Sequence, residues 1–135
     1  MKNGQCYFYD MSDKLTKIQE LKDLVEKFKN ERDWGHHHTP KNLAISISLE
    51  AAELMEHFQW GDWKEENREE IKKELADIII YCLSFASSNN IDVAEAVKAK
   101  MEHNAKKYPV SLFNKNRDSS ADYIRIKKAY RAKKL

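Results

Sequence analysis

The 135-residue chain contains only three glycines and two prolines, and this scarcity constrains its fold more than any other feature. Sheets and tight turns use many more of these residues, because glycine and proline supply the backbone conformations that turns require. A chain with so few of them is expected to form long helices joined by short connections. We therefore predict an all-α fold, and the length allows one hydrophobic core but not two.

Charge and hydrophobicity describe a globular protein with a nearly balanced surface. Hydrophobic residues make up 41% of the chain and charged residues 34%, and the formal net charge is +2. A protein that binds nucleic acid through its overall charge carries a much larger positive excess. We therefore expect no stable nucleic-acid partner.

The cysteines and the longest apolar runs indicate a cytoplasmic protein. Cys6 and Cys82 are far apart and show no C-x-x-C spacing, which is typical of a reduced compartment. No apolar run approaches the roughly 20 residues of a membrane span, and the first ten residues contain none long enough for a signal peptide. The sequence therefore predicts a cytoplasmic location and no membrane partner.

Apolar spacing and capping residues predict four helices. Ser12 is a good N-cap, and the apolar residues that follow it recur at helical spacing: Leu15, Ile18, Leu21, Val25 and Phe28. Thr39 before Pro40 starts a second helix, which should run to about Trp60 and end at Gly61. A third helix is expected over residues 65–88, and a fourth from Asp92, with Glu95 completing a capping box, to just before Pro109.

Three segments follow from this pattern. We expect residues 1–11 to be an irregular leader, residues 12–110 a helical domain, and residues 111–135 a basic C-terminal tail. Basic and aromatic residues alternate in this tail at ordinary helical spacing. A short amphipathic helix and a frayed tail fit the pattern equally well, and a solvated or partner-docking role is favoured over nucleic-acid contact.

Acidic residues lie where apolar ones are expected in the second and third helices. Glu50 falls within an apolar stripe of the second helix that consists of Leu43, Ile47, Glu50, Leu54 and His57, and Glu53 lies at its edge. In the third helix Glu74, Asp77 and Tyr81 share a stripe. A buried carboxylate is costly unless its charge is compensated. Each helix therefore offers a pair of acids at i and i+3, on a face that should meet a neighbour.

Four carboxylates brought together repel one another strongly. Two like charges about 4 Å apart repel by roughly 4 kcal/mol even at an effective dielectric of 20. Either the pKa values of these groups rise or a hard divalent cation binds, and oxygen ligands favour Mg²⁺ or Mn²⁺ over Zn²⁺. An alternative is that the acids lie on the solvated surface, as Glu69 and Glu70 do. A di-iron bundle is not favoured, because no Glu-x-x-His pair occurs in the chain.

The acid pattern resembles the E-x-x-E…E-x-x-D motif of the all-α MazG-like pyrophosphohydrolases. Within that superfamily the chain is most similar to the dCTP pyrophosphatase type. The resemblance covers roughly residues 12–110 and includes Glu31-Arg32-Asp33-Trp34, His38-x-Pro40-x-Asn42-Leu43, Phe58-Gln59-Trp60, Ile80-Tyr81 and Asn104-x-x-x-Tyr108-Pro109. The acid motif alone is loose, but together with both tryptophans it is specific. One departure is Val25, where the dCTP type has a histidine thought to touch the substrate.

The resemblance implies a set of site residues. The metal ligands would be Glu50, Glu53, Glu74 and Asp77. The substrate-binding residues would be Trp34, His38, Trp60 and Tyr81 for the nucleoside, Lys100, Asn104 and Lys107 for phosphates, and Asn42 as a further contact. Glu53 is our choice of general base. Trp34 and Trp60 also have a simpler interpretation as core or interface aromatics.

These expectations together describe a Mg²⁺-dependent nucleoside triphosphate pyrophosphohydrolase, in which Mn²⁺ can substitute. It would release a nucleoside monophosphate and pyrophosphate from a dCTP-like or non-standard nucleotide. Two alternatives stay open: a related dUTP or phosphoribosyl-ATP pyrophosphohydrolase, and a non-catalytic helical oligomeric interaction module.

The third helix also predicts assembly. Residues 78–83 read Ile-Ile-Ile-Tyr-Cys-Leu and are apolar all round, which one four-helix unit cannot cover. We therefore expect a four-helix-bundle-like fold of the MazG type that assembles as a dimer or tetramer, as the resemblance also implies.

Overall fold

The computed structural model describes residues 11–113 and 118–133, and these residues are all-helical. They form five α-helices and two short 3₁₀ helices, without a strand. The elements are α1 (Ile18–Asn30), α2 (Pro40–Glu56), η1 (Glu65–Asn67), α3 (Arg68–Ser88), α4 (Val93–Lys107), η2 (Val110–Leu112) and α5 (Ser120–Ala132). The predicted all-α class is confirmed. The expected leader lies outside the described residues except for Met11.

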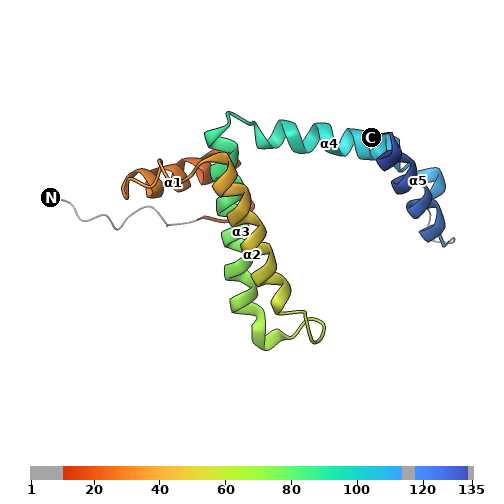
Figure 1. Cartoon of the computed structure of the whole chain (residues 1–135), viewed down its shortest axis with the longest axis horizontal. Helices are drawn as coiled ribbons and strands as arrows, with labels where there is room; N and C mark the ends of the chain where they lie inside the picture. Colours follow the sequence, from red (N-terminus) through yellow and green to blue (C-terminus); the bar gives the residue numbers. More distant parts are fainter. Residues whose placement is uncertain (1–10, 114–117, 134–135) are drawn as a thin grey trace. The chain divides into compact units, whose positions relative to one another are not determined.

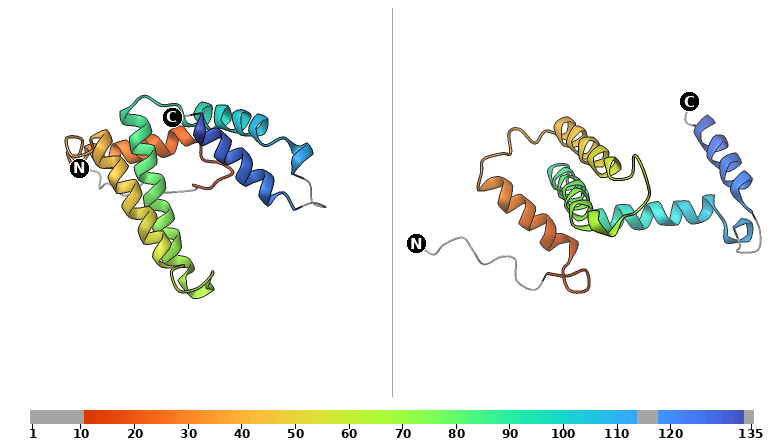
Figure 2. Two further views of the ribbon diagram at one scale, coloured as in Figure 1. Left: turned by 45° about the vertical axis from the view of Figure 1, so that its right-hand side comes forward. Right: turned by 90° about the horizontal axis from the view of Figure 1, so that it is seen from below.

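The chain divides into two compact units, residues 1–93 and residues 94–135. In the first unit α2 and α3 lie side by side as an antiparallel pair, and α1 lies at the end of the pair opposite the connecting loop (Figures 1 and 2). The second unit consists of α4 from Ala94 onward, η2 and α5. The predicted division at residues 12–110 and 111–135 stays a prediction.

The first helix starts later than predicted. It begins at Ile18, and its N-cap is Lys17, whose backbone N–H donates to a side-chain oxygen of Glu20 at 2.6 Å. Ser12 instead closes a separate turn, in which its carbonyl accepts from the backbone of Thr16 at 2.9 Å. Leu15 therefore lies outside the helix and is 72% exposed. The correction has a local cause: the Glu20 carboxylate caps the backbone one turn further along the chain.

The other predicted helices agree closely with the structure. Thr39 caps α2, because its side-chain oxygen accepts from the backbone N–H of Asn42 at 3.2 Å. α2 ends at Glu56 rather than near Trp60, and residues 57–60 continue as tighter turns, such as the one closed by Phe58 and Met55 at 2.9 Å. The third helix opens with the 3₁₀ turn η1, and the tail forms the helix α5.

The core of the first unit is small. Its buried apolar side chains are Leu43, Ile71, Leu83 and Ala86. Large apolar residues on α2 and α3 stay exposed in the single chain: Ile45, Leu49, Met55, Leu75, Ile79 and Ile80. Among the described residues no helix is long and apolar enough to cross a membrane.

Candidate metal and nucleotide site

The α2–α3 pair brings three acidic side chains together. Glu50 comes from α2, and Glu74 and Asp77 come from α3, one helical turn apart. One carboxylate oxygen from each lies within 4.8 Å of the others. Side chains at i and i+3 share a helix face, so the spacing that the sequence shows is the reason why both α3 acids face the same point. Three of the four predicted metal ligands thus converge.

Glu53, the fourth predicted ligand, lies outside this group of three but close enough to act on it. The pKa of Glu50 is raised by burial first, and then by the negative charges of Glu53, Asp77 and Glu74. Lys72 and Lys73 of α3 form their ion pairs with Glu69 and Glu70, at 3.0 and 2.7 Å, although the charge of Lys73 also interacts with Glu74. The direct ion pairs of these two lysines are therefore made outside the acidic group.

This donor set fits a hard divalent cation. All donors are carboxylate oxygens, which suit Mg²⁺ or Mn²⁺, whereas sites that select Zn²⁺ use nitrogen and sulfur ligands. A cation held between α2 and α3 would also remove the repulsion that raises the pKa of Glu50. The residues present are therefore able to bind a metal ion.

Three predicted pocket residues form an aromatic cluster. The His38 ring lies 6.2 Å from the Trp34 ring and 6.3 Å from the Tyr81 ring, measured between centroids. Tyr81 is one helical turn beyond Asp77 on α3, so the cluster lies next to the acidic group. Phe28 supports Trp34 from α1 in an edge-to-face contact at 5.8 Å.

Asn42 holds the loop that carries His38. Its side-chain amide donates to the carbonyl oxygen of His37 at 2.9 Å, and its backbone N–H donates to Thr39. The loop is fixed at its other end, because the backbone N–H of Trp34 donates to the carbonyl oxygen of Lys29 at 3.1 Å. A contact of Asn42 with substrate stays a prediction.

A partly buried ion pair beside His38 was missed by the sequence analysis. The Lys29 side chain is only 9% exposed, and its Nζ lies 2.7 Å from a Glu26 carboxylate oxygen. The pKa of His38 is lowered, by burial first and then by the Lys29 charge, and its Nδ1 atom is buried with no hydrogen-bond partner among the residues that the structure describes. The signal in the sequence was the position of Lys29, which comes four residues after Val25 on the apolar stripe of α1, where a side chain is expected to be buried.

Trp60 lies apart from the aromatic cluster. It is 91% exposed in the loop between α2 and α3. Tyr81 comes 13 residues after Arg68, where α3 begins, which is about 20 Å along the helix axis. The Arg68 end of α3 is the one that follows this loop. Within a single chain, Trp60 therefore lies far from the cluster of Trp34, His38 and Tyr81.

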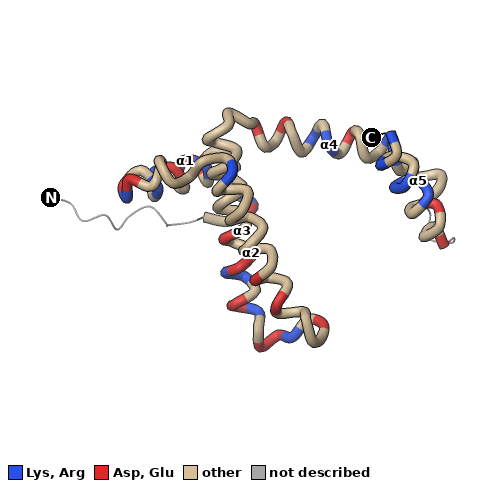
Figure 3. Tube along the Cα trace, in the orientation of Figure 1, with Lys and Arg blue, Asp and Glu red and all other residues tan. Residues whose placement is uncertain are grey.

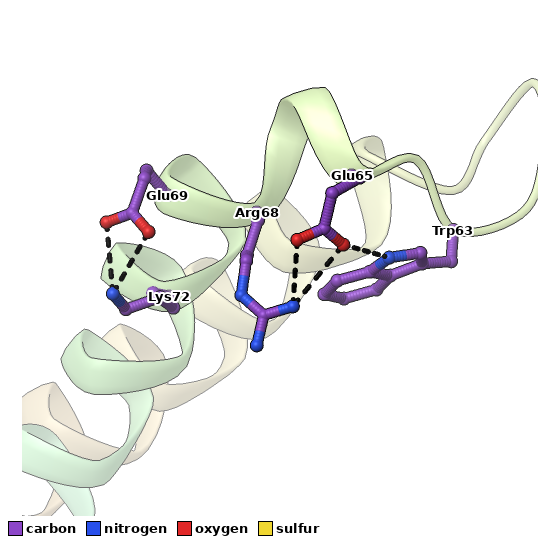
Figure 4. A network of polar contacts seen from close by, with 5 residues as sticks. All are labelled: Trp63, Glu65, Arg68, Glu69 and Lys72. Atoms are coloured by element: carbon purple, nitrogen blue, oxygen red, sulfur yellow. Dashed lines mark hydrogen bonds and ion pairs between the residues drawn. The ribbon is translucent and has the colours of Figure 1, made fainter.

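The loop that carries Trp60 is held by a polar network at the start of α3. The Trp63 Nε1 donates to Glu65 at 3.1 Å, and the Arg68 guanidinium donates to the same carboxylate at 2.9 Å (Figure 4). The Arg68 guanidinium also lies 5.9 Å from the Trp63 ring centroid. These contacts lower the pKa of Glu65, the Trp63 hydrogen bond first and the Arg68 hydrogen bond next. The carboxylate of Glu65 thus links the loop to the helix.

The predicted phosphate-binding residues Lys100, Asn104 and Lys107 all lie on α4, in the second unit. Lys107 is near the end of this helix, where its Nζ lies 4.0 Å from the ring centroid of Tyr130 on α5. Lys100 is exposed on the helix surface. Their role toward phosphates stays a prediction.

Replacing Glu50 should change how the stability of the metal-free protein depends on pH. The raised pKa of Glu50 means that the folded state keeps this proton to a higher pH than the unfolded chain does. The free energy of unfolding therefore falls as the pH rises from the ordinary glutamate pKa through the raised one, and stays lower above it. Glu50→Gln should remove that fall, which urea unfolding in the presence of a chelator can measure from about pH 4 to pH 7.

Glu56→Gln is the matched control, since Glu56 is on the same helix but outside the acidic group. It should keep the wild-type pH dependence. Added Mg²⁺ should stabilise the wild type and this control more than Glu50→Gln. If the free energies of unfolding of the wild type and Glu50→Gln fell in parallel as the pH rose, the acids would not be coupled.

Comparisons with known proteins identify the family of the chain. Residues 45–123 match the MazG-like family. The bovine protein dCTP pyrophosphatase 1 (Bos taurus) is 34% identical over 114 residues, which cover 78% of this chain and 66% of the bovine protein. The human protein of the same name (Homo sapiens) is 33% identical over 117 residues, covering 81% of this chain and 67% of that protein. The chain thus spans about two thirds of the length of these relatives.

A solved structure is also similar. The crystal structure of a pyrophosphatase from Archaeoglobus fulgidus DSM 4304 aligns with a TM-score of 0.62 and 42% sequence identity, covering 74% of this chain and 99% of that one. The resemblance inferred from the acid motif and the two tryptophans is confirmed. The chain belongs to the MazG-like family.

Proposed function

We propose that this protein is a Mg²⁺-dependent nucleoside triphosphate pyrophosphohydrolase. The observation that carries the proposal is the convergence of Glu50, Glu74 and Asp77 within 4.8 Å, next to the aromatic cluster around His38. The acidic group would bind the cation that phosphates require, and the aromatic cluster offers flat rings to a base. The bovine, human and archaeal relatives are all named pyrophosphatases, which supports the same activity.

The charges explain why the acids need a cation. A triphosphate brings roughly four negative charges, which the carboxylates would repel at short range. Glu50, Glu74 and Asp77, with Glu53 beside them, would hold the metal. When bound, Mg²⁺ neutralises charge on the phosphates and on the leaving pyrophosphate.

Glu53 is the proposed general base. It would take a proton from the water that attacks the α phosphorus, while the bond from that phosphorus to the oxygen bridging to the β phosphate breaks. The products are a nucleoside monophosphate and pyrophosphate. Glu53 suits this role because it lies outside the convergent group of three yet close enough to affect the pKa of Glu50.

We propose a dCTP-like or non-standard nucleotide as the substrate, so that the protein would remove unwanted nucleotides from the pool. The names of the bovine and human relatives support the first choice. dUTP and phosphoribosyl-ATP remain alternatives that use the same acids. A non-catalytic interaction module is disfavoured, because a degenerate site would have no reason to keep its acidic residues together.

We also propose that the protein works as a homodimer or tetramer. Leu49 on α2 and Leu75 and Ile79 on α3 are 58%, 49% and 45% exposed. Such apolar surface is typical of faces that pack against another subunit. In such an assembly Trp60 would contact a substrate held by the aromatic cluster of another copy. A cytoplasmic location and the lack of a stable nucleic-acid partner stay predictions.

The first experiment is a panel of deoxynucleoside and nucleoside triphosphates, dUTP and phosphoribosyl-ATP, with detection of released pyrophosphate. Turnover that needs Mg²⁺ or Mn²⁺ is expected, with the highest kcat/KM for dCTP or a modified relative of it. Glu53→Gln and Asp77→Asn should abolish turnover and keep the helical circular-dichroism spectrum, whereas Glu56→Gln should retain turnover. A folded wild type without activity toward any member would refute the proposed function.

Light scattering tests the assembly. We expect the mass of a dimer or tetramer at micromolar concentration, because burial of the exposed apolar residues on α2 and α3 stabilises the association. Leu49→Lys together with Ile79→Lys should shift the protein to smaller species. Lys14→Glu is the control, because it also changes a charge but lies in the segment before α1, away from the exposed apolar residues of α2 and α3. A stable wild-type monomer would contradict the proposal.

Trp60→Ala tests whether this ring stacks on the base. Base stacking on an aromatic ring contributes roughly 1–3 kcal/mol, which corresponds to about a 5- to 150-fold rise in KM. The value of kcat should change little, because the ring touches the base in ground and transition states alike. Mg²⁺ affinity should stay the same, since an indole is no ligand for this metal.

Trp60→Phe should restore most of the lost affinity, because it keeps an aromatic face. A purely structural role at a subunit interface predicts a different result. Trp60→Ala would then lower the melting temperature or the assembled mass, while the assembled fraction would keep a normal KM.

A further inference from the structure

Lys29 is a charged residue that the first unit buries. Figure 3 shows charged residues of both signs along α1. Among the residues that the structure describes, Lys29 is the one charged residue that is buried, with an exposed fraction of 7%. Removing a charge from water costs free energy, and an ion pair in such a place often stabilises a protein no more than apolar side chains of similar size do. The burial of Lys29 therefore calls for an explanation other than the stability of the fold.

Glu26 binds the Lys29 ammonium group with both of its carboxylate oxygens. The Nζ atom of Lys29 lies 2.7 Å from Oε1 and 2.7 Å from Oε2. The two residues are three positions apart on α1, so they share one face of the helix. The Glu26 side chain is 30% exposed, whereas that of Lys29 is only 9% exposed. The carboxylate is therefore the member of the pair that a ligand can reach more easily, and its oxygens keep lone pairs for further donors.

This ion pair lies at the edge of the aromatic cluster of Trp34, His38 and Tyr81, within the same unit. The carbonyl oxygen of Lys29 accepts from the backbone N–H of Trp34 at 3.1 Å, so the loop that carries Trp34 and His38 is attached at this residue. The pKa of His38 is lowered by burial first and then by the Lys29 charge, while the Glu26 charge raises it. Both charges are therefore close to the His38 ring.

Polar groups at this edge of the cluster have hydrogen-bonding capacity to spare. The buried Nδ1 atom of His38 has no partner among the described residues. Within the same part of the chain, the Glu26 carboxylate bonds to Lys29 and to no other side chain. Sites for flat organic ligands typically combine aromatic walls with a few polar groups that fix the orientation of the ligand. The cluster and the ion pair together have this composition.

A carboxylate at the edge of such a site distinguishes bases by the groups that they carry. It accepts hydrogen bonds and cannot donate one. It therefore favours the amino group that cytosine carries, and repels the carbonyl oxygen that uracil has at the same position. The Lys29 ammonium group can donate to a carbonyl oxygen, but it is the less exposed partner and already binds both Glu26 oxygens. The pair thus favours an amino-bearing pyrimidine over its keto counterpart.

We propose that Glu26 is a specificity-determining residue of the nucleoside pocket, which accepts a hydrogen bond from the amino group of a cytosine-type base, and that Lys29 positions its carboxylate. This inference rests on the proposed function, and it adds two residues of α1 to the site. The pair comes from α1, whereas the acids that would hold the metal come from α2 and α3. Its effect should therefore appear in base preference and KM rather than in kcat.

The test compares dCTP with dUTP as substrates of the wild type and of Glu26→Gln, at saturating Mg²⁺. We expect the wild type to have the higher kcat/KM for dCTP, and Glu26→Gln to lower this preference by about 5- to 150-fold. The carboxamide keeps the size of the side chain, but it can turn either its oxygen or its NH₂ group toward the base. The value of kcat for dCTP should change little.

Two further variants separate base recognition from packing. Asp23→Asn is the matched control, because it removes a carboxylate one turn earlier on α1 that bonds to Gln19 rather than to Lys29. It should keep the wild-type preference. Lys29→Met should lower the preference, since the carboxylate loses its anchor, but should add little in the Glu26→Gln background. That double variant leaves no unpaired charge, so it provides the measurement if Lys29→Met alone does not fold.

The outcomes distinguish this inference from the proposed function. An active wild type that does not prefer dCTP to dUTP, or a Glu26→Gln variant with the wild-type preference, would overturn the role of Glu26 alone. A purely structural ion pair would lower the melting temperature and reduce turnover of both nucleotides alike, and that result would do the same. A wild type that releases no pyrophosphate from any nucleotide of the panel would overturn the proposed function and this inference with it.

Discussion

Repulsion between carboxylates on two neighbouring helices is the constraint on which the rest of this structure depends. Glu50, Glu74 and Asp77 approach within 4.8 Å, and the charge of Glu53 adds to theirs. Like charges at such distances repel one another, although solvent weakens the repulsion between partly exposed groups. A small domain is typically stable by only about 5–15 kcal/mol, so even a weakened repulsion counts against the folded state. The acids are therefore best explained by a ligand that compensates them.

The small hydrophobic core, like the repulsion between the acids, leaves a single chain in need of further stabilisation. Four apolar side chains are buried in the first unit, while six large ones on α2 and α3 are exposed to solvent. Hydrophobic burial is the main favourable term in folding, so a domain that leaves this much apolar area exposed gains little from folding alone. Metal binding and subunit association would each stabilise the folded state by mass action. Metal binding and subunit association would thus both raise the stability of a chain whose own core is small.

Local chemistry decided which features could be predicted from the sequence. The start of α2 was predictable, because Thr39 and Pro40 act on the backbone of their own turn. The i and i+3 spacing of the acids likewise needs only helix geometry. The start of α1 was predicted wrongly, since Ser12 and the Glu20 carboxylate offer competing caps and sequence gives no measure of which is stronger. The position of Trp60, far along the hairpin from Tyr81, depended on where α2 ended and how the loop turned.

The ion pair between Glu26 and Lys29 could not have been predicted in the same way, and it bears on the nucleoside pocket. In a sequence, a charged residue on an apolar stripe indicates only an interruption of that stripe, because neither its ion-pair partner nor its burial is known. Here the pair is held beside His38, and the Lys29 charge helps to lower the pKa of that histidine. His38 therefore favours its neutral form, in which one ring nitrogen donates and the other accepts. Val25 on the same stripe is apolar, whereas Lys29, one turn further along α1, places a charge beside His38. The polarity of this face of the pocket therefore depends on the ion pair between Lys29 and Glu26, which links the packing of α1 to the protonation of His38.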